Sequence, residues 1–209
     1  KLEKDIIDAE IEELRQLGVE IKCGVDVGKD VTIQQLREQG YQAFYIAIGC
    51  QGGRLPGVPG ETAIGTDMAV SFLHKATENQ DQKLEGEVIV VGGGNVAVDC
   101  AMTAGRFGAA KVSMVCLESR DTMPASKAEI AEAEEENIVI CDGWGPKEIL
   151  TDENNRVTGV VFKKCLSTID PETGKFAPVY DENETVTMKA DHVIFAIGQS
   201  IQWGDLLKD

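Results

Sequence analysis

Hydrophobic residues recur every three to four positions in several segments of the chain, a spacing that predicts amphipathic helices. The first segment, EKDIIDAEIEELRQL, is followed by Gly18, a residue that favours the end of a helix. A later segment follows Thr32, whose hydroxyl is suited to cap a helix. By the same spacing we predict helices over residues 3–17, 31–39, 66–77, 95–107 and 126–136.

Short segments between these helices predict strands, and the nearly continuous apolar run at 41–49 suits a strand that is buried on both faces. The alternation of strands and helices between residues 87 and 142 is typical of a parallel sheet in a Rossmann-like α/β fold. The predicted strands are VEIKC (19–23), YQAFYIAIG (41–49), EVIVV (87–91), KVSMVCL (111–117) and IVICD (138–142).

The pattern changes to a period of two after residue 145. Clusters of turn-forming residues separate the alternating segments, which predicts an antiparallel β-meander of two or three strands. The segments are PKEILTD, RVTGVVFKKCLSTID and ETVTMKA. We interpret Trp144, just before them, as a packing anchor for this meander rather than a platform for stacking.

The run DHVIFAIG (191–198) has the same form as YQAFYIAIG (41–49), and both end in Ala-Ile-Gly. A stretch rich in glycine and proline, CQGGRLPGVPGE, follows the first run and is typical of a linker. The pair predicts that the chain leaves one sheet at Gly49 and re-enters it near Asp191. We therefore predict an arm of one α/β domain over residues 1–53, an inserted Rossmann-like domain over 54–190 and a second arm over 191–209.

Charge and composition narrow the functional classes. The net charge of −16 excludes a nucleic-acid partner and an anionic membrane surface, because both need a basic face. No apolar run approaches the roughly 20 residues that cross a bilayer. Six cysteines without a CxxC pair predict reduced thiols, a cytoplasmic location and no redox dithiol. The only two histidines lie far from other ligand-type residues, which argues against a metal site.

A glycine-rich turn joins the predicted strand 87–91 to the helix that follows it. It satisfies the dinucleotide-binding pattern G-x-G-x-x-A, in which the first glycine allows a tight turn and the second allows close approach of a pyrophosphate. The alanine lets helix and strand pack closely, and the helix N-terminus stabilises the phosphate charge. We expect Asn95 to cap this helix. The predicted phosphate-binding residues are Gly92, Gly93, Gly94, Asn95, Val96 and Ala97.

The next predicted strand ends in Leu-Glu-Ser-Arg, and its acid lies 24 positions after Gly94 (118 minus 94). A carboxylate near this spacing hydrogen-bonds the adenosine ribose and repels a 2′-phosphate. We therefore predict that Glu118, Ser119 and Arg120 lie at the ribose and that NAD(H) binds in preference to NADP(H). Two interpretations of Arg120 remain open, a contact to adenine or to a 2′-phosphate, or a solvated surface charge.

These features together resemble the pyridine-nucleotide-binding region of the glutamate synthase small-subunit family of flavoproteins, to which the electron-input region of dihydropyrimidine dehydrogenase also belongs. Members have the two-dinucleotide-binding fold of pyridine nucleotide-disulfide oxidoreductases. The matching stretches run in order over essentially the whole chain: IEELRQLGVEI, VGKDVTIQQL, AFYIAIGCQGGRLPGVPGE, VIVVGGGNVAVDCAMTAGRFGA, ESRDTMPAS, GWGPKEI and DHVIFAIGQ.

The resemblance implies an NAD(P)H domain inserted in an FAD domain, with hydride passing from the nicotinamide to the flavin and then to an iron–sulfur or partner-subunit acceptor. It implies that the rest of the FAD domain lies outside residues 1–209 and that no protein acid or base is needed. Members that use NADPH carry Arg-Arg where this chain has Leu117 and Glu118. The two Ala-Ile-Gly turns add Ile48, Gly49, Ile197, Gly198 and Gln199 to the cofactor-binding residues. The alternative is a nucleotide-binding regulatory or scaffold domain without redox chemistry.

Overall fold

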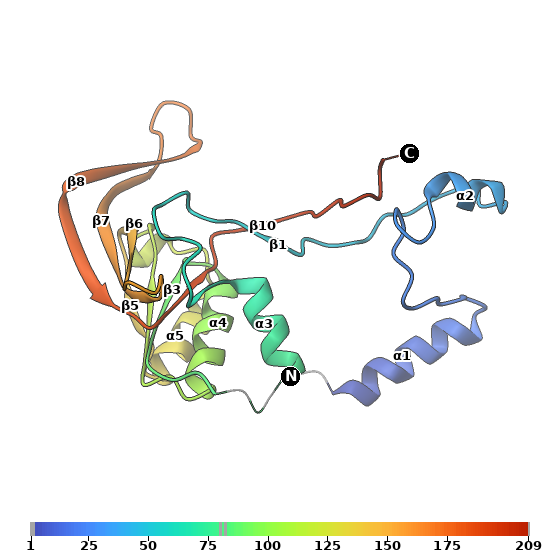
Figure 1. The fold of residues 1–209 in the computed structure, drawn as a ribbon, viewed down its shortest axis with the longest axis horizontal. Coiled ribbons are helices and arrows are strands. Elements are labelled where there is room, and N and C mark those ends of the chain that lie inside the picture. Colours follow the sequence, from blue (N-terminus) through green and yellow to red (C-terminus); the bar gives the residue numbers. More distant parts are fainter. Residues whose placement is uncertain (1–2, 80, 82, 209) are drawn as a thin grey trace. The chain divides into compact units, whose positions relative to one another are not determined.

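The chain divides into two compact units in the computed structural model, which describes residues 3–79, 81 and 83–208 (Figure 1). The first unit combines residues 1–48 with 202–209, and the second spans 49–201. Among the described residues, no helix has both the length and the apolar character that a membrane span needs.

The first unit contains two helices, α1 (Lys4–Gln16) and α2 (Ile33–Glu38), close to their predicted bounds. Helix α2 begins with a reciprocal pair of hydrogen bonds. The Thr32 hydroxyl accepts from the Gln35 N–H at 3.1 Å, and the Gln35 side chain accepts from the Thr32 N–H at 2.9 Å. This capping box satisfies two N–H groups that the helix itself leaves without partners, so the predicted cap is confirmed.

The first unit brings together two segments that are remote in sequence. A Cβ atom at Gly28, whose φ is +106°, would lie 2.5 Å from the backbone carbonyl carbon of Asp205 and from the N of Leu206. Only a glycine allows this approach. Leu206 is buried beside it, so residues near both ends of the printed sequence form one unit.

The predicted strands 19–23 and 41–49 are wrong for this structure, because neither segment forms a strand. Both carry exposed apolar side chains, and the Tyr45 side chain is 95% exposed. A strand needs a neighbour whose backbone can bond to it. Among the described residues of this unit, the only β-type pairing is an isolated bridge between Val27 and Val31.

The second unit is built on a five-stranded, wholly parallel sheet, as the alternation of strands and helices predicts. Its strands in spatial order are β2 (Thr66–Met68), β9 (His192–Phe195), β3 (Glu87–Val91), β4 (Lys111–Val115) and β5 (Val139–Cys141).

The sequence predicts that the chain re-enters a separate sheet near Asp191. The position of β9 shows that this prediction is wrong. The strand pairs with β3, where Val91 lies opposite Phe195, and on its other side with β2. The side chains of Val193, Ile194 and Phe195 are fully or almost fully buried. An apolar run of this kind fits the centre of any covered parallel sheet, so its likeness to residues 41–49 does not indicate a shared sheet.

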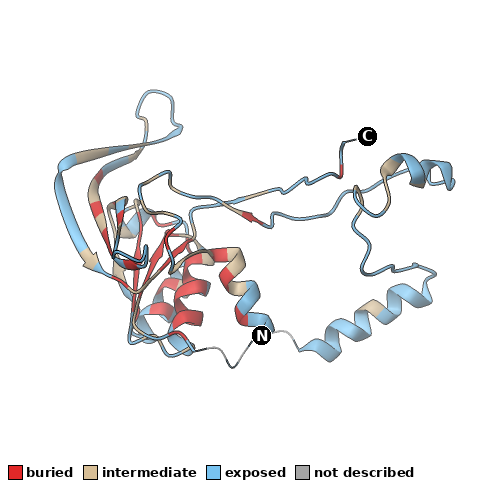
Figure 2. Cartoon of the chain, in the orientation of Figure 1, coloured by how far each residue is buried: buried red, intermediate tan, exposed pale blue. Residues whose placement is uncertain are grey.

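Helices cover one face of the parallel sheet and an antiparallel sheet covers the other. Val88 and Val90 point into the core beneath the helices, whereas Ile89 and Val91 belong to the core beneath the antiparallel sheet. Figure 2 shows the buried residues, in red, gathered mainly in the strands and helices of this unit. The helices are α3 (Ala69–Glu78), α4 (Asn95–Arg106) and α5 (Lys127–Glu135), with a 3₁₀ turn η1 (Arg120–Thr122) before α5.

The antiparallel sheet has three strands in the order in which they occur, which confirms the predicted meander. They are β6 (Trp144–Thr151), β7 (Val157–Ile169) and β8 (Phe176–Lys189). Strand β8 begins well before the predicted segment at residue 184. A further two-stranded pairing joins β1 (Gly52–Gly53) to β10 (Gln199–Ser200).

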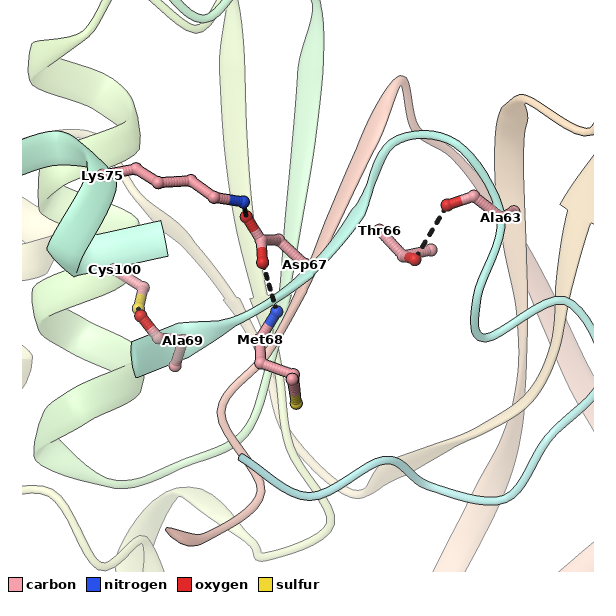
Figure 3. Close-up of polar contacts among 7 residues, drawn as sticks. All are labelled: Ala63, Thr66, Asp67, Met68, Ala69, Lys75 and Cys100. Atoms are coloured by element: carbon pink, nitrogen blue, oxygen red, sulfur yellow. Dashed lines mark hydrogen bonds and ion pairs between the residues drawn. The ribbon is translucent and has the colours of Figure 1, made fainter. Parts of the chain in front are cut away.

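The junction between β2 and α3 differs from the predicted helix over residues 66–77 (Figure 3). Asp67 lies in the strand, where its carboxylate accepts the Met68 N–H at 2.9 Å and pairs with Lys75 at 2.6 Å. The Cys100 thiol of α4 donates to the carbonyl of Ala69 at 3.9 Å. These contacts fix the start of α3 against α4 after a short strand.

Candidate nucleotide-binding site

A cavity of about 440 Å³ opens at the carboxyl ends of β9, β3 and β4. This edge is where open α/β sheets bind ligands, and the volume lies in the range of small-molecule sites. The wall is formed by Arg54, Leu55, Pro56, Val91, Gly92, Gly93, Gly94, Val115, Cys116, Leu117, Glu118, Pro124, Trp144, Pro146, Phe176, Pro178, Tyr180, Ala196 and Ile197.

The first two glycines of the loop are required by the protein's own packing. Gly92 has a φ of +142°, and a Cβ there would lie 2.4 Å from the carbonyl oxygen of Ala196, the residue that follows the neighbouring strand β9. A Cβ at Gly93 would lie 2.9 Å from the Cβ of Cys116 and 3.0 Å from a carboxylate oxygen of Glu118. Both positions therefore exclude side chains for steric reasons within the fold.

Gly94 is different, because a Cβ there would meet no atom within 4 Å. Its φ of −93° and ψ of 175° are open to any residue. Among the described residues, the N–H groups of Gly94, Asn95 and Val96 donate to no backbone carbonyl. Open space beside free N–H groups at a helix start fits a phosphate group.

The prediction that Asn95 caps α4 is wrong. Gly94 is the N-cap residue, and no side chain caps the helix. The Asn95 side-chain carbonyl instead accepts the N–H of Ser126 at 2.9 Å, and Ser126 caps α5 through its hydroxyl. Asn95 therefore joins the starts of two helices beside the cavity. Ala97 is completely buried against the sheet, as its role in close helix–strand packing requires.

Glu118 lies where the cavity wall passes from β4 toward the β5–β6 turn. One of its carboxylate oxygens is close to Gly93, and its backbone carbonyl accepts the N–H of Gly143 at 3.0 Å. This bond fixes the segment after β4. The carboxylate thus lies beside the glycine loop, close enough for one dinucleotide to contact both.

Arg120 and Ser119 do not line the cavity. The Arg120 guanidinium pairs with the carboxylate of Glu134 in α5. The backbone N–H of Arg120 donates to the carboxylate of Asp142 at 3.0 Å. The Ser119 hydroxyl is 2.9 Å from the hydroxyl of Thr122. This arrangement matches neither interpretation of Arg120 as stated, because its charge is paired with Glu134 and holds η1 against α5.

The second Ala-Ile-Gly turn is divided between two pockets. Ile197 lines the large cavity, whereas Gly198, Gln199 and Val96 line a neighbouring pocket of about 120 Å³. The first Ala-Ile-Gly turn lines neither pocket, and its residues Ile48 and Gly49 fall at the division between the two units.

Sequence reasoning missed two parts of the wall. The linker supplies Arg54, Leu55 and Pro56, and the antiparallel sheet supplies an aromatic and proline-rich side. Trp144 packs against the core, as its interpretation as an anchor predicts, and it also belongs to this side of the wall. The aromatic residues of the meander are the sequence signal that could have identified this side of the wall. Aromatic rings near the edge of a sheet where ligands bind are candidates for contact with a ligand.

The cavity contains few titratable groups. Arg54 and Glu118 are its only charged lining residues among those described. Burial, with smaller effects of the Glu118 and Asp142 carboxylates, raises the pKa of the Cys116 thiol to about 12, so this sulfur is a neutral thiol rather than a nucleophile. In the described part of the chain, no three histidine, cysteine or acidic residues cluster as metal ligands would. The arrangement of the cavity is suited to binding and orienting a ligand.

A glycine loop between a parallel strand and a helix, with an acid after the next strand, defines a Rossmann-type dinucleotide-binding domain. The chain belongs to the pyridine nucleotide-disulphide oxidoreductase family, whose model matches residues 3–202.

Several relatives are named as subunits or chains of oxidoreductases. The chain is 35% identical to the NADP(+)-dependent formate dehydrogenase subunit beta of Moorella thermoacetica, covering 96% of this chain and 28% of that protein. It is 32% identical to the NAD-dependent dihydropyrimidine dehydrogenase subunit PreT of Escherichia coli O157:H7, covering 100% of this chain and 45% of PreT. It is 31% identical to the glutamate synthase [NADPH] small chain of Halomonas elongata, with 95% and 43% covered. The chain thus spans less than half the length of these relatives.

Solved structures share the fold. FprA from Mycobacterium tuberculosis in complex with NADPH aligns with a TM-score of 0.66 at 17% identity, covering 84% of this chain and 54% of FprA. The thioredoxin reductase of T. acidophilum aligns with a TM-score of 0.53 at 20% identity, covering 76% and 45%. The expected α/β fold of the family is confirmed. Because the family and these relatives are oxidoreductases, the alternative of a regulatory or scaffold domain is not favoured.

Proposed function

We propose that the cavity binds a nicotinamide dinucleotide and that the chain is the nucleotide-binding region of a flavin-dependent oxidoreductase. The observation that carries this proposal is Gly94, whose missing side chain leaves open space beside the free N–H groups of α4. The fold itself does not require a glycine there, whereas a pyrophosphate does. Membership of the family supports the redox function.

In this proposal each part of the wall holds one part of the dinucleotide. The N–H groups of Gly94, Asn95 and Val96 bind the pyrophosphate, and Glu118 accepts the hydroxyl groups of the adenosine ribose. The nicotinamide half then lies toward Ile197, on the β9 side of the sheet. FAD supplies the hydride acceptor when bound, so these residues need only bind and orient the donor.

We also propose that the first unit belongs to an FAD-type domain, as the resemblance implies. Its composition from residues 1–48 and 202–209 supports this, because the nucleotide-binding unit is then an insertion between two arms. Electrons pass onward to an iron–sulfur or partner-subunit acceptor in this scheme. The relatives named as a subunit or small chain of larger enzymes support such an arrangement.

Between the two nucleotides, we propose that NADH binds in preference to NADPH. Glu118 lines the cavity beside the glycine loop, and its charge would face a 2′-phosphate. Arg120, the nearest basic residue in sequence, is already paired with Glu134. Relatives with either specificity match the chain, so the proposal depends on these side chains rather than on the family.

The binding part is tested by calorimetric titration of NADH into the purified chain. We expect saturable binding at one site, and heats equal to those of dilution would contradict the proposal.

The redox part is tested by anaerobic mixing of NADH with the flavin-loaded protein that contains this chain. Loss of flavin absorbance at roughly 450 nm is expected, and an unchanged spectrum with bound NADH would remove the redox function alone.

A further inference from the structure

The antiparallel sheet supplies an aromatic side to the cavity that the Rossmann pattern does not account for. Trp144 begins β6 and Tyr180 lies in β8, and both line the cavity. In the register of this sheet, Trp144 lies opposite Lys164, and Tyr180 lies opposite the next residue of β7, Cys165. The two aromatic residues are therefore one register position apart, with β7 between their strands, and what they share is the wall of the cavity rather than one face of the sheet.

Backbone hydrogen bonds join Trp144 and its neighbour Gly143 to the segment that follows β4. The Trp144 N–H donates to the carbonyl of Cys116 at 2.8 Å, and the Gly143 N–H donates to the carbonyl of Glu118 at 3.0 Å. The start of β6 is therefore bonded to the segment that carries the proposed ribose-binding carboxylate. Trp144 lies beside Glu118 in the wall rather than across the cavity from it.

The Tyr180 ring lies beside the same part of the wall, because Gly145 has no side chain to exclude it. A Cβ at Gly145 would lie 2.6 Å from Cε1 of Tyr180 and 2.7 Å from Cδ2 of Leu117. The tyrosine ring thus lies over the Gly145 backbone, next to the Leu117 side chain. Gly145 is buried, and any side chain there would push the ring away.

Lysine side chains hold both rings in place. The ammonium of Lys163 lies 4.2 Å from the centre of the Tyr180 ring, and that of Lys164 lies 4.8 Å from the Trp144 ring. Such cation–π contacts favour one orientation of each ring. Lys163 is itself fixed by an ion pair with Glu182 at 2.6 Å. The aromatic surface is therefore ordered before any ligand arrives, which lowers the entropic cost of binding.

We propose that Trp144 and Tyr180 form the binding surface for the adenine ring of the dinucleotide. This inference rests on the proposed function, because it places adenine beyond the ribose held by Glu118. The strand order supports this placement of adenine. Strands β4 and β5 lie on one side of β3, the strand that precedes the glycine loop, and β9 lies on the other side. Adenine against Trp144 and nicotinamide toward Ile197 thus occupy opposite ends of one cavity.

The test compares Tyr180→Leu with Tyr180→Phe, which keeps the ring, and with Tyr45→Leu, which removes an aromatic side chain that is 95% exposed. Binding of NADH, ADP and the reduced nicotinamide mononucleotide is titrated for each variant. We expect Tyr180→Leu to weaken NADH and ADP about tenfold, as for other bases stacked on aromatic residues. The mononucleotide should bind as before, and the other two variants should differ from the unmodified chain by less than about twofold.

A second measurement does not depend on a substitution in the cavity. Trp203→Phe leaves Trp144 as the only tryptophan, since the sequence contains two. ADP should quench its fluorescence, and the mononucleotide should not. The proposal is overturned if Tyr180→Leu binds ADP normally and ADP leaves Trp144 fluorescence unchanged while NADH still binds. Failure of the unmodified chain to bind NADH would instead overturn the proposed function, and this proposal with it.

Discussion

Arg120 directs its guanidinium to the carboxylate of Glu134, although it lies only two positions after the acid that lines the cavity. The pair joins the turn η1 to helix α5. A positive charge that the sequence places two positions after the predicted ribose-binding acid is thus already paired within the protein. Glu118 is left as the charge that a ribose or a 2′-phosphate would meet in this part of the wall.

We expect NADH to bind at least about tenfold more tightly than NADPH, because a carboxylate facing a dianionic phosphate in a partly desolvated site is strongly unfavourable. Glu118→Ala should narrow this gap by removing the repulsion. Arg120→Ala is the matched control and should change either affinity by less than about twofold. Titration of both reduced nucleotides against the three proteins is the measurement. Tighter binding of NADPH to the unmodified chain would mean that Arg120 leaves Glu134 to face the ligand.

Substitutions at two glycines of the loop should affect the stability of the fold and the binding of nucleotide differently. Gly94→Val should abolish nucleotide binding while lowering the free energy of unfolding by no more than about 1 kcal/mol, since φ is −93° and nothing lies near its Cβ. Gly92→Ala should instead destabilise the fold by roughly 2 kcal/mol or more, because the new Cβ would meet the Ala196 carbonyl. Urea denaturation and NADH titration of both variants test this contrast. Equal losses of stability would show that Gly94 has a structural role.

The cysteines should differ sharply in reactivity. Burial raises the pKa of Cys100 and of Cys116 to about 12, so both remain neutral thiols at about pH 8 and are shielded from solvent. Cys23 and Cys50 are exposed. Iodoacetamide at that pH should therefore label the exposed pair first, as judged by mass spectrometry of the native protein. Labelling of Cys116 as fast as Cys23 would place its sulfur in open solvent and contradict the buried wall.

His192 at the start of β9 should contribute to acid sensitivity. Burial lowers the pKa of its imidazole below the usual 6.5, and the nearby Asp191 carboxylate opposes this shift only partly. Below about pH 6.5 the unfolded chain then binds this proton more readily than the folded chain, so stability falls as the pH falls. His192→Gln should lose less stability than the unmodified chain between about pH 7 and 5.5 in urea denaturation. His74→Gln, at an exposed histidine, is the control and should follow the unmodified chain.

Local patterns predicted the centre of the second unit well. The strand at residues 87–91, its glycine turn and the following helix have strong sequence signals, because apolar runs and helix starts are decided over a few residues. The place of β9 was not predictable in this way. Its residues indicate a buried strand, but which strands flank it depends on pairing across more than one hundred residues (195 minus 91 is 104).

The same limit of prediction from local sequence applies to the wall of the cavity. Glu118 was found because the Rossmann pattern fixes its distance from the glycines along the chain. Tyr180 and Trp144 were not found as cavity residues, because the register of β6, β7 and β8 places them beside β4. Arg120 pairs with Glu134 because α5 packs back toward the turn, a contact for which the sequence contains no spacing rule.

The position of β9 also sets the order in which the site can be completed during synthesis. The glycine turn leaves the ribosome before β9, because the carbonyl of Ala196 that packs against Gly92 and the Ile197 side of the cavity come about a hundred residues later. Pairings over such sequence distances slow folding, since a long loop must close first. Until β9 inserts between β2 and β3, both of those strands have an unpaired edge that invites pairing with other chains. A nucleotide that binds only the closed cavity would favour the finished sheet and shorten this exposed period.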